Sequence, residues 1–329
     1  MNWKNIVFTK VLPLSVTFVT LAAFAQENNL GSSRKVEGVY TENLKQAVDS
    51  ALPSFNEAGL SLQLKRLHSQ YANGAPGVSV RDFQTLAKTF GLPTPQVRPG
   101  ETYTETASFA LGLDPKSGKV LVHKNLETLP ALSQVEAKRA LPLATRNHQA
   151  LLTKLGVDTK QVFFAESTFM NLQSASDPKL GRSEVSPVVV DAILYEGVRG
   201  LGGFLVDGSS FKLSSKNAQT VEGADLVWPT VRFHPGLRKF EVRKRAELSQ
   251  EILRQVTDTT SKGDKVNVKM AVVLRPVQTS AGEFFIPALR VGVLSARNEG
   301  GNMFYVNLVN DQTPYVEPRA VDSSEGGGN

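Results

Sequence analysis

The sequence contains no cysteine among its 329 residues. This absence excludes disulfides, thiolate metal sites and thiol catalysis. Small exported domains often need disulfides, but a chain of this length can bury enough apolar surface to fold without them. We therefore expect a fold that depends on its hydrophobic core alone.

Histidine is also scarce, because only His68, His123, His148 and His234 occur and each is isolated in the sequence. A zinc site on one helix needs two histidines four residues apart, and no pair has this spacing. The zinc-protease pattern His-Glu-x-x-His is absent. We expect these histidines to have surface or packing roles, and we expect no metal and no other cofactor.

Motifs for nucleophilic catalysis and nucleotide binding are lacking as well. Ser209-Ser210 leads into an apolar strand pattern, whereas a nucleophile elbow leads into a helix. The glycines of Gly197–Gly203 precede another strand pattern, whereas a dinucleotide loop opens a helix. We interpret them as a sharp hairpin turn or a place where another chain approaches closely. Paired carboxylates need only meet in space, so a hydrolase with a spatially assembled site is the alternative function.

The longest uncharged apolar run, Val11 to Phe24, has about 14 residues, against roughly 20 that span a bilayer. It follows Lys4 and Lys10 and ends at the small-x-small sequence Ala23-Phe24-Ala25, which is the layout of a secretory signal peptide. We expect residues 1–25 to be cleaved and the protein to be exported, periplasmic or extracellular, and not integral to the membrane after cleavage. A retained membrane anchor is the alternative.

Charge of one sign is not in large excess, since Lys and Arg number 37 and Asp and Glu 31. Basic residues nevertheless gather in one segment. The possible patch for an anionic partner comprises Arg232, Arg238, Lys239, Arg243, Lys244 and Arg245. A solvated helix face is the simpler interpretation, and docking to an anionic envelope surface is the functional one. Aromatic residues for base stacking are sparse nearby, so nucleic-acid binding is not expected.

Changes in composition and in the apolar pattern divide the chain into regions. After the signal peptide, residues 26–36 form a polar, flexible leader, and residues 310–329 form a tail that we expect to be disordered. Residues 37–130 are predicted to be an N-terminal helical region with a β-hairpin. Residues 131–309 are predicted to be an α+β region.

Local patterns place the elements. Apolar residues at helical spacing predict helices near 60–71 and 83–90, and Ser79 or Asp82 can cap the second of them. A capping box at Ser133 and Glu136 opens a helix towards Leu155. Pro142 inside that pattern predicts a kink or two helices. A further helix is expected over 240–256. Strands are expected over 104–113 and 119–124, which flank a turn at 114–118 that ends at Gly118 and form the β-hairpin. Further strands are expected within 162–232 (188–195, 204–207, 211–214, 220–223 and 226–233), and over 265–276, 284–296 and 302–309. The fold class predicted from this order is α+β, with a helix packed on an antiparallel sheet.

A recognisable motif covers Tyr195–Leu213. It has glycines at the end of a strand pattern, followed by Val206-x-Gly208-Ser209-x-Phe211-x-Leu213. It is followed by Trp228-Pro229 and later by the strand pattern Pro287–Val291. These features resemble the propeptide domains of secreted thermolysin-like and fungalysin-type metalloproteases and the related PepSY-like modules. The resemblance extends over 135–309. It implies cystatin-like units, in which an antiparallel sheet wraps a helix, without the protease domain.

Modules of this kind bind proteins, assist folding or inhibit proteases, and the resemblance implies the same here. We therefore expect an exported, non-catalytic protein-interaction module, an inhibitor or folding assistant of a secreted hydrolase. An extended partner can add a strand to an exposed sheet edge. The sequence suggests residues 302–309 as the edge candidate.

Overall fold

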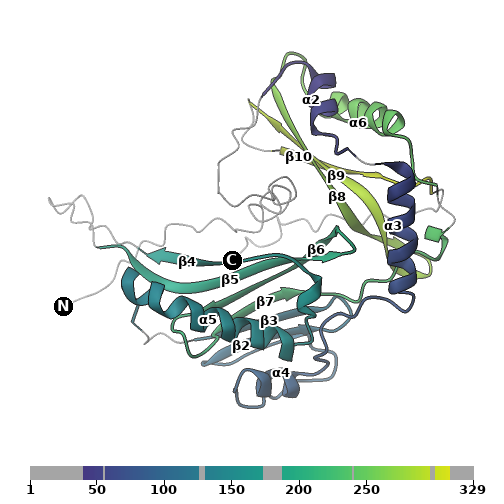
Figure 1. Ribbon diagram of the computed structural model, residues 1–329. Helices are drawn as coiled ribbons and strands as arrows, with labels where there is room; N and C mark the ends of the chain where they lie inside the picture. Colours follow the sequence, from purple (N-terminus) through teal and green to yellow (C-terminus); the bar gives the residue numbers. More distant parts are fainter. Residues whose placement is uncertain are drawn as a thin grey trace, which may run out of the picture. The chain divides into compact units, whose positions relative to one another are not determined.

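The computed structural model describes residues 40–54, 56–125, 130–172, 187–238, 241–296 and 301–311 (Figure 1). The predicted signal peptide (1–25), the leader (26–36) and the predicted tail from residue 312 onwards lie outside these ranges. Among the described residues, no helix has the length and apolar character needed to cross a membrane.

The described residues form ten strands, five α-helices and two short 3₁₀ helices. The helices are α2 (Leu44–Ala51), α3 (Glu57–Gln70), α4 (Phe83–Thr89), α5 (Gln134–Lys154), α6 (Arg245–Thr259), η1 (Thr159–Gln161) and η3 (Pro235–Arg238). The strands are β1 (Tyr103–Glu105), β2 (Phe109–Asp114), β3 (Lys119–Lys124), β4 (Val162–Leu172), β5 (Val189–Leu201), β6 (Phe204–Ser215), β7 (Gly223–Val227), β8 (Val266–Thr279), β9 (Gly282–Ser295) and β10 (Gly301–Asn307).

The predicted fold class is wrong. Strands make up 40% and helices 29% of the described residues, and the strands join in one large mixed sheet. The fold is dominated by this sheet and is not built from cystatin-like units of a helix on an antiparallel sheet. The sheet is mixed because β6 pairs in parallel with β8 at Leu205–Val273 and Val206–Leu274. A parallel contact between strands so distant in sequence leaves no local pattern.

The hairpin predicted within residues 37–130 is formed by β2 and β3 and belongs to the large sheet. It is not an appendage, because β3 pairs with β7 over Lys119–His123. Val120 and Val122 are buried on one side of this pairing. Their alternation with polar residues correctly predicts a strand with one buried face, but it carries no information about which distant strand pairs with it.

The chain forms two compact units, each built from separate stretches of sequence. Unit 1 contains the described residues within Met1–Phe55, Arg243–Val272 and Leu289–Leu308. Unit 2 contains those within Asn56–Val242, Val273–Ala288 and Val309–Asn329. Strands β8 and β9 thus contribute residues to both units.

Unit 2 is built on seven antiparallel strands in the order β1-β2-β3-β7-β6-β5-β4. Helices α4 and α5 cover one face (Figure 1), where alternate strand residues and the helices form the core. Two of its large side chains, Phe211 and Trp228, are at most 2% exposed. Burial of each such side chain stabilises the fold by about 1.5–3 kcal/mol.

Unit 1 packs α2 and α6 with β10 and the adjoining parts of β8 and β9. The stripe Leu248, Ile252 and Val256 on α6 is fully buried. Helix α6 begins five residues later than predicted. The preceding segment is extended, since Val242 bridges Val309 and the Arg243 amide donates to the Leu308 carbonyl. These backbone hydrogen bonds hold the segment before α6 in an extended form, so the helix begins only at Arg245.

Helix starts follow the predicted caps. Ser133 and Glu136 form the capping box, in which the Ser133 amide donates to Glu136 Oε2 at 2.8 Å and the Glu136 amide donates to Ser133 Oγ at 3.3 Å. Asp82 caps α4 by accepting from the Thr85 amide at 2.7 Å. Helix α5 continues through Pro142, so the alternative of two helices is wrong.

Turns also follow the predicted glycines. Gly118 in the β2–β3 turn has φ +66°, and a Cβ there would lie 2.4 Å from the Trp228 backbone, so no larger residue fits. Gly202 and Gly203 both have positive φ at the β5–β6 turn, as a tight two-residue hairpin requires. By contrast, the two short strands predicted around Gly208 are one continuous strand, β6.

Candidate functional site

The predicted basic patch is divided by its surroundings. Arg243 forms an ion pair with Glu251, with 2.6 Å between Nη2 and Oε2, and also donates to the Asn307 carbonyl at 3.2 Å. Arg245 donates to the backbone carbonyls of Asp49, Leu52 and Pro53, where α2 ends. A cation at a helix C-terminus binds the carbonyls that the helix leaves unpaired. Both arginines therefore have structural roles within unit 1.

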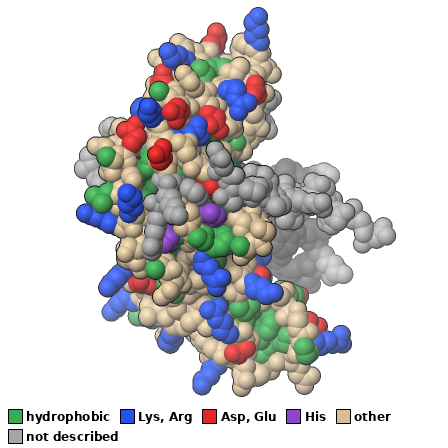
Figure 2. All heavy atoms as spheres, turned by 90° about the vertical axis from the view of Figure 1, so that its right-hand side faces the viewer, with side chains coloured by type: hydrophobic (Ala, Val, Ile, Leu, Met, Phe, Trp, Pro, Cys, Tyr) green, Lys and Arg blue, Asp and Glu red, His purple; other side chains and the backbone are tan. Residues whose placement is uncertain are grey.

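The other residues of the predicted patch do not take part in the contacts made by Arg243 and Arg245. Lys244 is exposed at the start of α6, and Arg232 is exposed in unit 2. Arg238 ends η3, and Lys239 lies outside the described residues. The face drawn in Figure 2 has lysine and arginine side chains interspersed with acidic and uncharged ones. An anionic-partner role for the patch stays a prediction.

Among the described residues, Arg199 on β5 is the most deeply buried charged side chain, at 0% exposed. Its guanidinium donates to Gln161 Oε1 at 2.6 and 2.9 Å and to the carbonyls of Pro76 and Pro229, and it lies 4.9 Å from the Trp228 ring. Burial lowers the pKa of Arg199 to about 10. The donors are directed at protein carbonyls, so this arginine ties together three segments of unit 2 and presents no ligand site.

Within the described part of the chain, His148 and Ser215 form a pair of the kind that a nucleophile and its base would make. His148 Nε2 lies 2.8 Å from Ser215 Oγ, and the ring stacks on Tyr195. Both side chains are at most 2% exposed, and burial lowers the pKa of His148 to about 4. A catalytic base must reach the substrate proton and needs a pKa near the working pH. The pair meets neither condition in this conformation, so we assign it a packing role.

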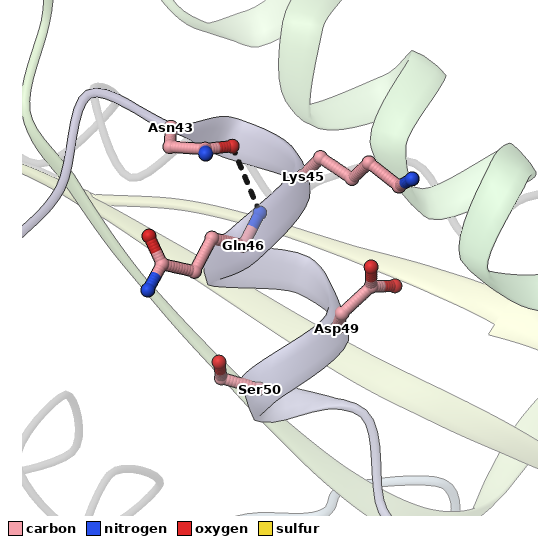
Figure 3. A pocket seen from close by; sticks show the side chains of 5 residues that line it. All are labelled: Asn43, Lys45, Gln46, Asp49 and Ser50. Carbon is pink, nitrogen blue, oxygen red and sulfur yellow. Dashed lines mark hydrogen bonds between the residues drawn. The ribbon is translucent and has the colours of Figure 1, made fainter.

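A shallow depression of about 420 Å³ lies on α2 (Figure 3). It is lined by Asn43, Lys45, Gln46, Asp49 and Ser50. The hydrogen bond drawn there, from the Gln46 amide to Asn43 Oδ1 at 3.1 Å, is the helix cap. All five side chains are exposed and come from one short helix. Within the described ranges, no three side chains of metal-ligating type converge.

Strand β4 offers a different kind of site, an unpaired sheet edge. It is 11 residues long and pairs antiparallel with β5 on one side. On its other side, no described strand is hydrogen-bonded to it (Figure 1). An edge strand presents a row of free backbone N–H and C=O groups, which can pair with another chain.

The side chains of β4 do little to discourage such pairing. Natural edges are protected by lysine, proline or short length, but β4 contains no lysine, arginine or proline, and its one charge is Glu166. Phe163, Met170 and Leu172 are 37%, 42% and 54% exposed. The register with β5 shifts between Val162 and Phe164 and between Met170 and Asn171, so the regular stretch lies between these irregularities.

Helix α5 fixes β4 from one face of the sheet. Thr145 and Ser167 share a hydrogen bond of 2.7 Å between their hydroxyl oxygens, and Gln134 donates to Asn171 Oδ1 at 2.8 Å. The strand is therefore held in an extended, preorganised form. Preorganisation reduces the entropy that binding must overcome.

The glycines of β5 explain how aromatic residues pack beside this edge. A Cβ at Gly200 would lie 2.8 Å from Phe163 side-chain atoms, and a Cβ at Gly197 would lie 2.5 Å from the Phe211 ring. Gly197 and Gly200 thus accommodate aromatic side chains of the same chain, and the predicted hairpin turn is formed by Gly202 and Gly203. Sequence reasoning placed strands within 162–232 but did not single out β4. The aromatic and β-branched residues Val162, Phe163, Phe164, Thr168 and Phe169 were the available signal, because such residues favour strands.

Two other strands end the sheet order in the described part of the chain. Strand β10, which covers most of the predicted edge candidate 302–309, is indeed terminal, and β1 is terminal at the other end. They have 7 and 3 residues, respectively. Beyond β10, residues 308–310 already pair with residues 241–243. Strand β4 is therefore the longest of the three terminal strands in the described part of the chain.

The sequence matches no family model, and a search of curated proteins finds no relative.

Proposed function

We propose that this is an exported, non-catalytic protein-interaction protein, which binds an extended segment of a partner polypeptide along the outer edge of β4. The observation that carries the proposal is the 11-residue edge with no basic residue and no proline. Main-chain hydrogen bonds supply affinity in this mode of recognition, and alternate side chains supply specificity.

The kind of partner follows from the sequence features. The signal-peptide layout of residues 1–25 supports an exported protein that meets its partner outside the cytoplasm. The resemblance of Tyr195–Leu213 to protease propeptide and PepSY-like sequences supports a secreted hydrolase as that partner, with inhibition or assisted folding as the outcome. Strand addition suits both roles, because it engages backbone that is extended or not yet folded.

The test is a crosslinked pull-down from the native envelope and secreted fractions, with mass spectrometry, using three proteins. Beside the wild type, Met170→Lys places a charge on the β4 edge, and Met303→Lys places the same charge at a similarly exposed position on β10. Lysine at an edge opposes strand addition. We expect Met170→Lys to weaken capture of the main partner about tenfold, and Met303→Lys to leave it unchanged.

Circular dichroism and thermal unfolding must first show that both variants fold. Equal capture by wild type and Met170→Lys would refute the β4 edge as the site. Retention on envelope material that is lost with salt, without a protein partner, would instead support the basic residues as an anionic-surface site.

A further inference from the structure

Glu166 lies at the end of a row of charged side chains that crosses the sheet. The registers place Glu166 opposite Glu196 on β5, Glu196 opposite Lys212 on β6, and Lys212 opposite Asp225 on β7. Residues directly opposite each other project from the same face. Their face is opposite to that of Tyr195 and Leu213, whose side chains lie in the core under α5. The row therefore runs across the face that α5 does not cover.

The row carries more negative than positive charge. Lys212 Nζ lies 3.1 Å from Glu196 Oε1 and is the one basic side chain among the four. Glu196 is 4% exposed, and burial raises its pKa, which Lys212 lowers and Glu166 raises further. Glu166 itself is exposed, and no ion pair involves it among the described residues. Two like charges thus face each other at the β4 end, with a cation on one side only.

The next position in this row belongs to whatever strand is added to β4. Resting on the proposed function, we infer that the partner segment places a lysine or arginine directly opposite Glu166. Opposite charges on facing residues stabilise a strand pair and like charges destabilise it. A basic residue there would flank the two glutamates with a cation on each side.

The same register defines the neighbouring positions of the partner. Two residues to either side of the basic residue, the partner faces Phe164 and Thr168, which lie on the same side as Glu166. The intervening residues face Ala165 and Ser167, on the side of α5. The recognised segment therefore alternates, with β-branched residues on the α5 side and the basic residue at the centre of the other side.

A second copy of this chain does not fit this chemistry. Symmetric antiparallel pairing of β4 with itself sets Glu166 opposite a residue of its own alternation, namely Phe164, Glu166, Thr168 or Met170. None of these is basic, and one arrangement opposes Glu166 to itself. The geometry therefore favours a different polypeptide over a homodimer through β4.

The inference can be tested with three labelled peptides, Val-Thr-Val-X-Val-Thr-Val, in which X is lysine, glutamine or glutamate. Binding to the full chain is measured by fluorescence anisotropy at low salt. We expect the lysine peptide to bind about 3- to 10-fold more tightly than the glutamate peptide. Glu166→Gln should remove this preference, and Glu166→Lys should reverse it. Asp225→Asn, a change at the far end of the row, should leave it in place.

The outcomes separate this inference from the proposed function. Equal binding of all three peptides, abolished by Met170→Lys, would overturn the charge preference and leave the edge site standing. If none of the three peptides binds, both the charge preference and the β4 edge site are overturned. A dimer in sedimentation that Met170→Lys dissociates would show that a second copy occupies the edge, and would overturn the inference.

Discussion

Acid should destabilise this protein through His148. The ring is 0% exposed, stacks on Tyr195 and keeps Nε2 at 2.8 Å from Ser215 Oγ. Its Nδ1 has no hydrogen-bond partner among the described residues, so an added proton there would be buried without an acceptor. Burial accordingly lowers the pKa to about 4, and the folded protein holds a neutral ring at neutral pH.

The sign and size of the effect follow from proton linkage. An unfolded histidine titrates near pH 6.5, so between about pH 6.5 and 4 the unfolded chain binds more protons than the folded one. The free energy of unfolding therefore falls as the pH decreases through this window. With a folded pKa of about 4, the loss reaches about 3 kcal/mol at the lower end.

The assay is urea unfolding from pH 7 to pH 4, followed by fluorescence of the buried Trp228. His148→Gln removes the titrating group, so its stability should fall less steeply with acid, and the gap to wild type should narrow by about 3 kcal/mol. His123→Gln, at an exposed position on β3, is the control and should run parallel to wild type. Parallel curves for wild type and His148→Gln would refute the reasoning.

Two further predictions concern the buried arginine contacts. Arg199→Lys should cost about 2–4 kcal/mol in urea unfolding, because an ammonium lacks the planar fork that now serves three carbonyl groups; a loss below 0.5 kcal/mol, about the scatter of surface substitutions, would contradict this role. Arg245→Gln should cost about 1–3 kcal/mol through the lost contacts at the end of α2. The neighbouring, exposed Lys244→Gln should change stability by less than about 0.5 kcal/mol, and equal effects of the two would argue against the structural role of Arg245.

Local features of the fold were predictable from the sequence. The capping box at Ser133, the cap at Asp82 and the turn glycine Gly118 all occur where the patterns place them. Each depends on hydrogen bonds or backbone geometry within a few residues. The helical spacing of Leu60, Leu64 and Leu67 also correctly predicted the buried face of α3.

The pairing of distant strands was not predictable. The partners of Val120 on β3 and of Leu205 on β6 lie far along the chain, and many strands of similar alternation compete for them. For this reason the elements were largely correct while the fold class was wrong. The late start of α6 has the same origin, since Val242 pairs with Val309 instead of continuing the helix.

For the candidate site, too, local features could be predicted from the sequence and distant contacts could not. The helix predicted over 240–256 would have placed Arg243 on a helix face, but Arg243 precedes α6 and forms an ion pair with Glu251. The composition of β4, without lysine or proline, was readable in the sequence. That this strand lies at an edge depends on the sheet order, which only the structure provides.

Hydrogen–deuterium exchange of β4 in the presence of the captured partner tests the central claim most directly. Strand addition should slow the exchange of alternate amides between Phe164 and Met170, because those that point away from β5 gain acceptors. Exchange in β10 should stay unchanged, and Met170→Lys should abolish the protection of β4. Unaltered exchange throughout β4, with protection elsewhere in a saturated complex, would contradict the account.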